Sequence, residues 1–264
     1  MKGTTSHIIK TTNLSIGYQS KKNTTYVAKD INLTLDKGVL VCILGKNGIG
    51  KSTLLRTLTN VQPKLSGEII LNGKPLETIS NAELAKKMSL VLTERIPESN
   101  LTVYELIALG RQPYTNWIGA LTKEDLNFIE VAIQQTNIKD IVYKKHYELS
   151  DGQLQKVMIA RALVQNTEII TLDEPTAHLD LHNKIEIFQL LKKLSQDLHK
   201  TILISTHEIH LALQLADELW LMNDNDILTG KTEELIANES VAKLFSSDLV
   251  TFDLKSKQFI INSD

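Results

Sequence analysis

Short apolar runs of strand length recur along the chain and are separated by turn-forming residues. Four of these runs predict strands buried in a sheet, over residues 39–44, 89–92, 168–173 and 201–205. Two alternating stretches near the N-terminus predict half-exposed strands, over residues 7–10 and 31–35. Turn residues also predict three short antiparallel segments, over residues 67–75, 218–228 and 250–261.

Helical periodicity dominates residues 101–164. Residues 102–110 begin with a Thr cap and end at Gly110, which predicts a helix that stops at this glycine. A second helix is expected over residues 123–137, and a third begins near Ser150. Outside this stretch, helices are predicted over residues 53–58, 81–87, 183–198 and 208–217.

Strands on both sides of a helical stretch indicate an α/β fold. We therefore expect a single domain of residues 1–264, with a core made of residues 1–94 and 166–264 and an inserted helical subdomain of residues 95–165.

Composition excludes several classes of protein. Hydrophobic residues make up 42% of the 264 residues and charged residues 23%, which is ordinary for a globular chain. The net charge of −2 gives no basic field for a nucleic-acid partner. The longest apolar runs fall short of the roughly 18–20 residues that span a bilayer, and the polar first residues predict a cytoplasmic protein. Cys42, the single cysteine, lies within a predicted strand and forms no disulfide within the chain.

Residues 45–52 read GKNGIGKS and fit the pattern of a phosphate-binding loop. A buried strand is predicted before this segment and a helix after it, which is the context that the pattern requires. Glycines let successive N–H groups point at one anion, and the positive end of the following helix favours that anion. Lys51 is expected to reach the β- and γ-phosphates, and Ser52 to hold Mg²⁺. The expected nucleotide contacts from this segment are Gly45, Asn47, Gly48, Gly50, Lys51, Ser52 and Thr53.

Polar residues end two other predicted strands. Asp173 is suited to holding Mg²⁺, directly or through water. Glu174 is suited to accepting a proton from an attacking water. His207 is placed to hydrogen-bond the γ-phosphate or that water. Since strand ends at one sheet edge lie side by side, these residues are expected near the phosphate loop.

Five segments occur in the order found in ABC-type ATPases. They are the phosphate loop, LSDGQ at 149–153, LDEP at 172–175, AHLD at 177–180, and Thr206-His207. Over nearly all its length the chain resembles the ATP-binding subunit of an ABC transporter, and the LSxGQ segment is absent from other phosphate-loop families. The resemblance implies an α/β fold: a P-loop NTPase core with a mixed sheet, an antiparallel β subdomain and the inserted α-helical subdomain.

The resemblance also implies how the subunit works. Two copies dimerise head to tail, and each ATP lies between one phosphate loop and the other copy's Ser150, Gly152 and Gln153. A helix N-cap at Ser150 would turn free amides and a dipole toward the γ-phosphate. Asp180 resembles the residue that links the two sites. Tyr18, which composition alone would assign to the core, corresponds to the aromatic residue that stacks on adenine.

Two positions depart from the common family pattern. Asp151 stands where a second Gly is usual, and a carboxylate there repels phosphate unless its side chain points away. Glu94 stands where Gln is usual, so we expect it to ligate Mg²⁺, although an ionised carboxylate donates no hydrogen bond.

Residues 102–114 are similar to the corresponding segment of importers of iron–siderophore complexes, haem and cobalamin, and zinc or manganese importers have close relatives of it. The implied partners are a second ATPase subunit, membrane-spanning permease subunits and, indirectly, a substrate-binding protein. These partners would hold the chain at the cytoplasmic face of the cell membrane. One alternative is a soluble ABC-type ATPase in repair, translation or iron–sulfur assembly. A nucleotide-binding regulator without turnover is the other, and the presence of Glu174 and His207 argues against it.

Overall fold

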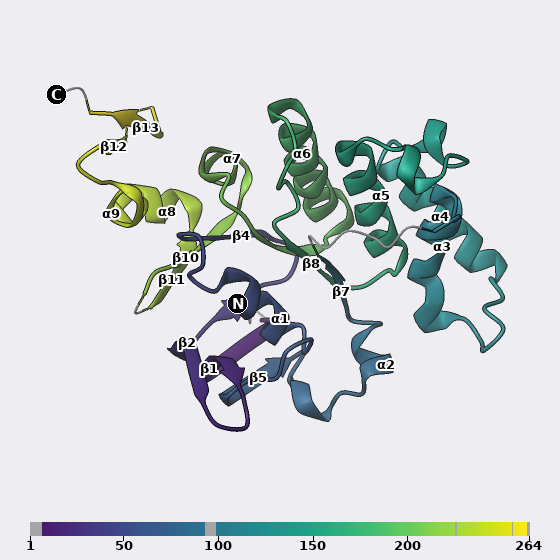
Figure 1. The fold of residues 1–264 in the computed structure, drawn as a ribbon, viewed down its shortest axis with the longest axis horizontal. Helices are drawn as coiled ribbons and strands as arrows, with labels where there is room; N and C mark the ends of the chain where they lie inside the picture. Colours follow the sequence, from purple (N-terminus) through teal and green to yellow (C-terminus); the bar gives the residue numbers. More distant parts are fainter. Residues whose placement is uncertain (1–6, 93–98, 225, 255, 263–264) are drawn as a thin grey trace, which may run out of the picture. The chain divides into compact units, whose positions relative to one another are not determined.

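The computed structural model describes residues 7–92, 99–224, 226–254 and 256–262 (Figure 1). The chain divides into two compact units. The first contains Met1–Thr78 and Leu203–Asp264, and the second contains Ile79–Ile202. The mixed α/β architecture confirms the predicted fold class.

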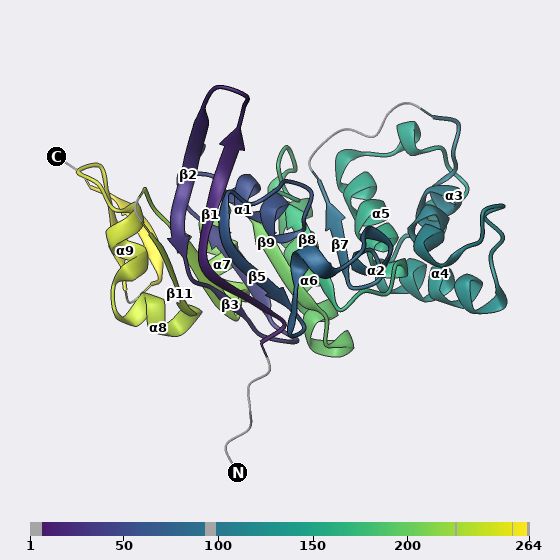
Figure 2. The ribbon, with the colours of Figure 1, turned by 90° about the horizontal axis from the view of Figure 1, so that it is seen from below.

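An antiparallel sheet forms one layer of the first unit. Its strands are β1 (Ile9–Gln19), β2 (Thr24–Ile31), β3 (Thr34–Leu35), β5 (Ser66–Leu71) and β6 (Lys74–Pro75), in the order β2-β1-β5-β6 with β3 beside β1 (Figure 2). Strand β1 is longer than predicted, since it continues through Tyr18. Its register shifts between Thr12 and Ser15, and Asn13 has a φ of 47°, so the alternation that would have revealed the strand is interrupted.

A second set of strands in the first unit is mixed. Strand β10 (Glu218–Met222) runs parallel to β4 (Leu40–Leu44) and antiparallel to β11 (Ile227–Lys231). Strand β9 (Thr201–Ser205), within which the two units divide, follows β4 in the strand order. Every residue of β4 is buried, as its continuous apolar run predicted. The core of this layer also holds Trp220, which is 0% exposed.

Four helices and a hairpin complete the first unit. The helices are α1 (Lys51–Leu58), α7 (Ile209–Leu215), α8 (Thr232–Ala237) and α9 (Ser240–Phe245). The predicted C-terminal hairpin is confirmed as β12 (Val250–Asp253) and β13 (Gln258–Ile261). Helices α8 and α9 were not predicted, because each is only 6 residues long and shows less than two turns of periodicity.

The second unit contains two parallel strands, β7 (Met88–Val91) and β8 (Ile169–Asp173), which pair from Met88–Ile169 to Val91–Leu172. Its helices are α2 (Asn81–Leu84), α3 (Val103–Ala108), α4 (Lys123–Gln135), α5 (Asp151–Val164) and α6 (Leu181–Leu198). Helices α3 and α4 both pack on α5 (Figure 2). The predicted helical stretch is therefore present, whereas the boundaries of a subdomain at 95 and 165 stay a prediction.

The local sequence explains where four of these helices begin. In each, a Ser or Thr accepts a hydrogen bond from the backbone N–H three residues on, and the side chain of that later residue accepts one from the cap's own N–H. The pairs are Ser80 and Glu83 for α2, Thr102 and Glu105 for α3, Thr122 and Asp125 for α4, and Ser150 and Gln153 for α5.

The sequence predicted that a helix ends at Gly110, and this prediction is wrong. Helix α3 ends at Ala108, and the chain continues as a 3-10 turn, Leu109–Tyr114. A Cβ at Gly110 would lie 2.2 Å from the carbonyl oxygen of Arg161 in α5. Glycine is required at this position because it lets two backbones approach each other.

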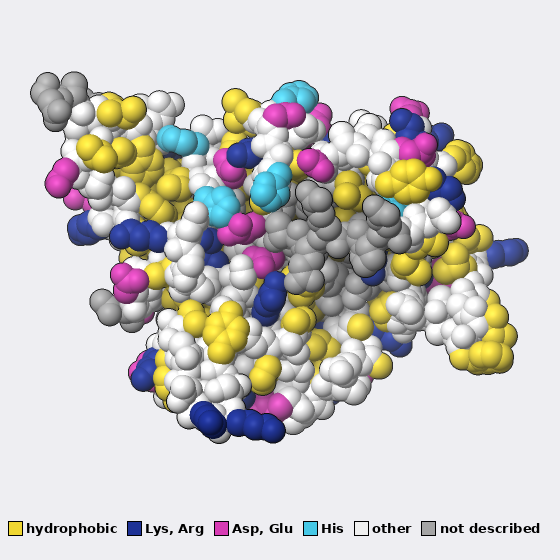
Figure 3. Space-filling model, viewed as in Figure 1, with side chains coloured by type: hydrophobic (Ala, Val, Ile, Leu, Met, Phe, Trp, Pro, Cys, Tyr) yellow, Lys and Arg dark blue, Asp and Glu magenta, His cyan; other side chains and the backbone are white. Residues whose placement is uncertain are grey.

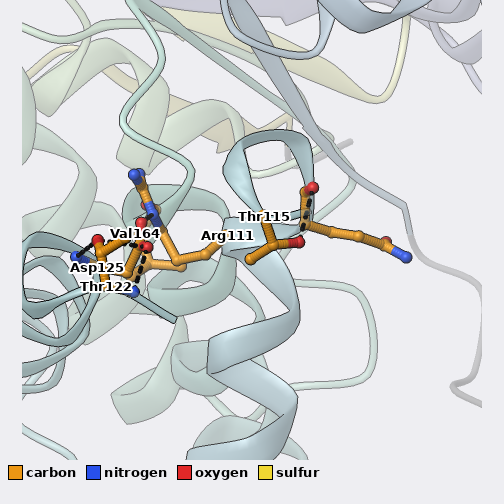
Figure 4. A network of polar contacts seen from close by, with 6 residues as sticks. Arg111, Thr115, Thr122, Asp125 and Val164 are labelled. Atoms are coloured by element: carbon orange, nitrogen blue, oxygen red, sulfur yellow. Dashed lines mark hydrogen bonds and ion pairs between the residues drawn. The ribbon is translucent and has the colours of Figure 1, made fainter. Parts of the chain in front are cut away.

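A buried ionic network joins the same turn to α4 and α5 (Figure 4). Arg111 Nε donates to Asp125 Oδ1 at 2.6 Å, and Nη1 donates to the carbonyl oxygen of Val164 at 2.9 Å. Thr122 Oγ1 donates to the second carboxylate oxygen of Asp125 at 2.7 Å. Asp125 therefore caps α4 and neutralises Arg111, and the network holds the 3-10 turn against two helices.

On the face shown in Figure 3, basic and acidic side chains are interspersed over the described residues, in keeping with 29 Lys and Arg against 31 Asp and Glu. Among the helices in the described residues, none combines the length and the apolar character that crossing a membrane requires.

Candidate functional site

The phosphate loop joins the buried end of β4 to α1, and its glycines have backbone conformations that other residues rarely adopt. Gly48 has a φ of 77° and Gly50 a φ of 111°. A Cβ at Gly50 would also lie 2.1 Å from Cγ1 of Val27 in β2. Both the backbone angle and the close contact with Val27 therefore require glycine at the last position before the helix.

Lys51 lies folded over the loop. Its side-chain Nζ donates to the carbonyl oxygen of Gly45 at 3.0 Å and to that of Lys46 at 3.2 Å, and the residue is 4% exposed. An ammonium group held in this way places a positive charge inside the curve of the loop. That position suits the contact with phosphate oxygens that the sequence predicted.

The first turn of α1 differs from those of the four helices that begin with a capping box. Its N-cap is Gly50, and within the described part of the chain no side chain caps the turn. The first turn also contains no acidic residue. The first amides of a helix need an acceptor, and the helix dipole favours a negative one. This arrangement fits the phosphates of a nucleotide.

Tyr18 lies beside α1, at the end of β1. Its hydroxyl is 2.9 Å from Oγ1 of Thr53, and the residue is 56% exposed. The exposure excludes a core role, the alternative that composition favoured. The structure thus brings together two predicted nucleotide contacts, Tyr18 and Thr53. Stacking of the ring on adenine stays a prediction.

His207 follows β9 in a short turn anchored at the end of β4. The N–H of Thr206 donates to the carbonyl oxygen of Ile43 at 3.1 Å, two residues before the loop begins. Two further bonds hold the turn: the N–H of Glu208 to Thr206 Oγ1 at 3.0 Å, and the N–H of Ile209 to the carbonyl oxygen of His207 at 2.9 Å. The first unit therefore places Thr206 against the strand that leads into the loop. His207, the next residue, is exposed.

Asp173 and Glu174 belong to the second unit. Asp173 is the last residue of β8 and is 3% exposed. Glu174 has a φ of 46°, an uncommon backbone conformation for this residue, and its carbonyl oxygen accepts from the N–H of Ala177 at 3.1 Å. The strand therefore ends in a tight turn at the two carboxylates. Their approach to a nucleotide stays a prediction.

The residues of the LSDGQ segment form the start of α5. Ser150 Oγ accepts from the N–H of Gln153 at 3.3 Å, and Gln153 Oε1 accepts from the N–H of Ser150 at 3.1 Å. Ser150 is therefore an N-cap, as predicted, but these two amides already have acceptors in this structure. The exposed Asp151 occupies the first turn, where the helix dipole favours a carboxylate.

Asn183 connects two of the predicted residues and was missed by the sequence analysis. A Cβ at Gly152 would lie 2.3 Å from Asn183 Oδ1, so α5 and α6 approach closely at this glycine. Asp180 caps α6 by accepting from the N–H of Asn183 at 2.9 Å and from its Nδ2 at 2.8 Å. These bonds lower the pKa of Asp180. The available sequence signal was the position of Asn183 three residues after Asp180, where an N-cap side chain accepts a backbone hydrogen bond.

Mg²⁺ needs only one or two protein ligands, because it usually retains several waters. The Ser52 hydroxyl at the start of α1 and the Asp173 carboxylate at the end of β8 are ligands of suitable chemistry. Glu94, the third predicted ligand, lies outside the described residues.

Known proteins resemble this chain over most of its length. Residues 28–177 match the model of the ABC transporter family. An ABC transporter ATP-binding protein of Methanocaldococcus jannaschii, described as uncharacterized, is 40% identical over 240 residues, which cover 90% of this chain and 81% of the relative. The iron(3+)-hydroxamate import ATP-binding protein FhuC of Bacillus subtilis is 33% identical, covering 91% of this chain and 88% of the relative.

Solved structures show a similar fold. One is a dimeric ATP-binding cassette, MJ0796, in a post-hydrolysis state bound to ADP and Pi. It superposes with a TM-score of 0.72 at 29% identity, covering 85% of this chain and 98% of the cassette.

Proposed function

Because the chain belongs to the ABC transporter family and is an ATP-binding ATPase subunit of that family, we propose that its hydrolysis of ATP powers an importer of metal chelates. The observation that carries the nucleotide site is the start of α1 at Gly50, which has no side-chain cap, together with Lys51 folded over the preceding loop. The proposed cargo class rests on the relatives.

In the proposed reaction, water attacks the γ-phosphorus, the bond to the oxygen bridging the β- and γ-phosphates breaks, and Glu174 accepts the proton. Lys51 and the amides of α1 hold the phosphates. His207 hydrogen-bonds the γ-phosphate. Bound Mg²⁺ would neutralise the charge that develops on the phosphate oxygens. Ser52 and Asp173 are its proposed ligands, together with Glu94.

The proposed active form is a head-to-tail homodimer. Each ATP would contact the phosphate loop of one copy and Ser150, Gly152 and Gln153 of the other. The capping box of α5 would then exchange its internal acceptors for phosphate oxygens, and Asp180 would link the two sites. The dimeric, ADP-bound cassette of similar fold supports this arrangement.

Import requires partners that cross the membrane. We propose that the helical stretch between residues 95 and 165 docks on permease subunits at the cytoplasmic face of the membrane, and that a substrate-binding protein supplies the cargo. The name of the iron(3+)-hydroxamate import relative favours an iron–siderophore complex over haem, cobalamin or another metal.

Glu174→Gln tests the chemistry. We expect ATP binding to persist and steady-state ATPase activity to fall by about 10²–10⁴-fold, the usual contribution of a general base. The same variant should form an ATP-dependent dimer in size-exclusion chromatography. Glu168→Gln, at the exposed residue just before the opposite end of β8, is the matched control and should retain activity. A Glu174→Gln protein with most of its activity would contradict the assigned base.

Purification of the chain from native membranes tests the transport role. A multi-span permease should co-purify, and cells that lack the chain should lose uptake of ferric siderophores. Co-purification of nucleic-acid or translation factors without a membrane protein would favour a soluble ATPase instead.

A further inference from the structure

Three of the five phenylalanines in the chain lie in its last twenty residues, around the C-terminal hairpin. Phe259 in β13 contacts both of the others. Its ring centroid is 4.8 Å from that of Phe252 in β12 and 6.1 Å from that of Phe245 in α9. Phe252 is 5% exposed. The hairpin and α9 (Figure 1) therefore share a small aromatic core centred on Phe259.

Phe259 also contacts a residue outside this core. The ring of His210 lies 6.1 Å from the ring of Phe259, with an angle of 74° between the planes. Edge-to-face pairs of this kind are directional, so each ring restrains the other's position. His210 is the second residue of α7 and lies three residues after His207.

The turn between the two histidines has little freedom. One end is fixed to β4 by the bond from Thr206 N–H to Ile43, and the backbone bond from Ile209 to His207 closes the turn onto α7. A shift at the start of α7 therefore moves the backbone of His207, because the bond from Ile209 N–H to the His207 carbonyl oxygen joins the two.

We propose that Phe259 is a positioning residue for His207: through His210, the C-terminal hairpin sets where the His207 side chain meets the γ-phosphate. The inference rests on the proposed function of His207. Phe259 itself would touch neither nucleotide nor Mg²⁺.

The test compares steady-state Mg-ATP hydrolysis by full-length variants. Phe259→Ala should lower kcat by about threefold or more, in the range of couplings between contacting residues, with little change in KM for ATP. Phe259→Tyr, which keeps the ring, should restore kcat. His210→Ala should reproduce the loss, and the double variant should be no worse than either single one. Because His210 is exposed, its variant keeps the test available if Phe259→Ala fails to fold.

Phe252→Ala is the matched control. It removes a more deeply buried ring from the same core, but in the described structure Phe252 forms no ring pair with His210. If the cluster acts only by holding the hairpin together, Phe252→Ala should lower kcat as much as Phe259→Ala does, and the proposal is then wrong. An unchanged kcat in folded Phe259→Ala and His210→Ala proteins would also overturn it.

His207→Ala separates the two proposals. If its kcat equals that of the wild type, the assigned role of His207 is wrong, whatever Phe259 does. If its activity collapses while the Phe259 and His210 variants stay fully active, only the positioning inference fails.

Discussion

Arg111 and Asp125 form an ion pair that is buried on both sides, with 2.6 Å between Nε and Oδ1 and side-chain exposures of 5% and 4%. The guanidinium also lies over the rings of Tyr114 and Phe128, at 3.9 Å and 4.5 Å from their centroids. Removing either member would leave the other charge buried and unpaired.

Arg111→Met should therefore reduce the free energy of unfolding by about 3–5 kcal/mol, the usual loss when one partner of a buried pair is removed. Urea denaturation monitored by circular dichroism measures the change. Lys64→Met breaks the more exposed Lys64–Glu77 pair, with 2.8 Å between its charged atoms, and should cost less than about 1 kcal/mol. Equal losses for the two variants would show that burial of the Arg111 pair contributes nothing.

The same pair predicts a dependence of stability on pH. Burial alone would raise the pKa of Asp125, but hydrogen bonds from Thr122 and Arg111 outweigh it and lower that pKa. Since the folded pKa lies below the unfolded one, the stabilisation is complete above the unfolded value and is lost as pH falls through the folded value. The difference in stability between wild type and Asp125→Asn should thus shrink below about pH 4. Parallel stability curves for the two proteins in acid would contradict this.

Gly110→Ala should destabilise the second unit, because its new Cβ would lie 2.2 Å from the Arg161 carbonyl oxygen and force the 3-10 turn away from α5. We expect a loss of about 1–3 kcal/mol, as for other overpacked sites. Gly230→Ala is the control, because the atom nearest to its new Cβ, Leu235 Cγ at 3.3 Å, belongs to a side chain that can move. Thermal melts of both variants would disprove the prediction if Gly230→Ala proved the more destabilised.

Substitutions of Tyr18 separate its ring from its hydroxyl. If the ring stacks on adenine, Tyr18→Phe should bind ATP about as tightly as the wild type, although it loses the bond to Thr53. Tyr18→Ala should bind more weakly by about 0.5–1.5 kcal/mol, which is roughly 2- to 13-fold in Kd. Isothermal titration measures both. A Phe variant as weak as the Ala variant would assign the contribution to the hydroxyl instead.

Lys51→Ala removes the ammonium group that lies over the phosphate loop. A hydrogen bond to a charged group contributes about 1.5–3 kcal/mol, so the Kd for ATP should rise roughly 10- to 150-fold. Lys46→Ala is the matched control, since Lys46 belongs to the same loop but is exposed. Unchanged affinity in Lys51→Ala, or an equal loss in Lys46→Ala, would contradict the assignment of the loop.

Patterns of local origin were predictable from the sequence. The apolar run of β4, the cap at Thr102 and the turn at Asn72-Gly73 each depend on neighbouring residues, and the structure confirms all three. Features that depend on distant partners were not predictable. Gly110 looked like a helix stop because it follows a helical pattern. Its actual role, close packing against the backbone of Arg161 in α5, depends on a residue that lies about fifty positions later in the sequence.

The same distinction between local patterns and distant partners applies to the candidate site. The phosphate loop was identified from eight consecutive residues, and its glycine conformations agree with that interpretation. Asn183 was missed because its role depends on two residues from different elements, Gly152 and Asp180. The exposure of Tyr18 likewise depends on how β1 ends beside α1, which no local pattern records.

A nucleotide bound at the glycine-led start of α1 would also stabilise the fold. Gly50 offers no side-chain acceptor to the first turn of α1, which weakens the helix by roughly a few tenths of a kcal/mol relative to Ser or Asp, and phosphate oxygens would supply acceptors there. The strand, loop and helix around Lys51 should therefore tighten as nucleotide concentration rises, by mass action. The free ATP concentration, relative to its Kd, would then influence how long the chain survives proteolysis.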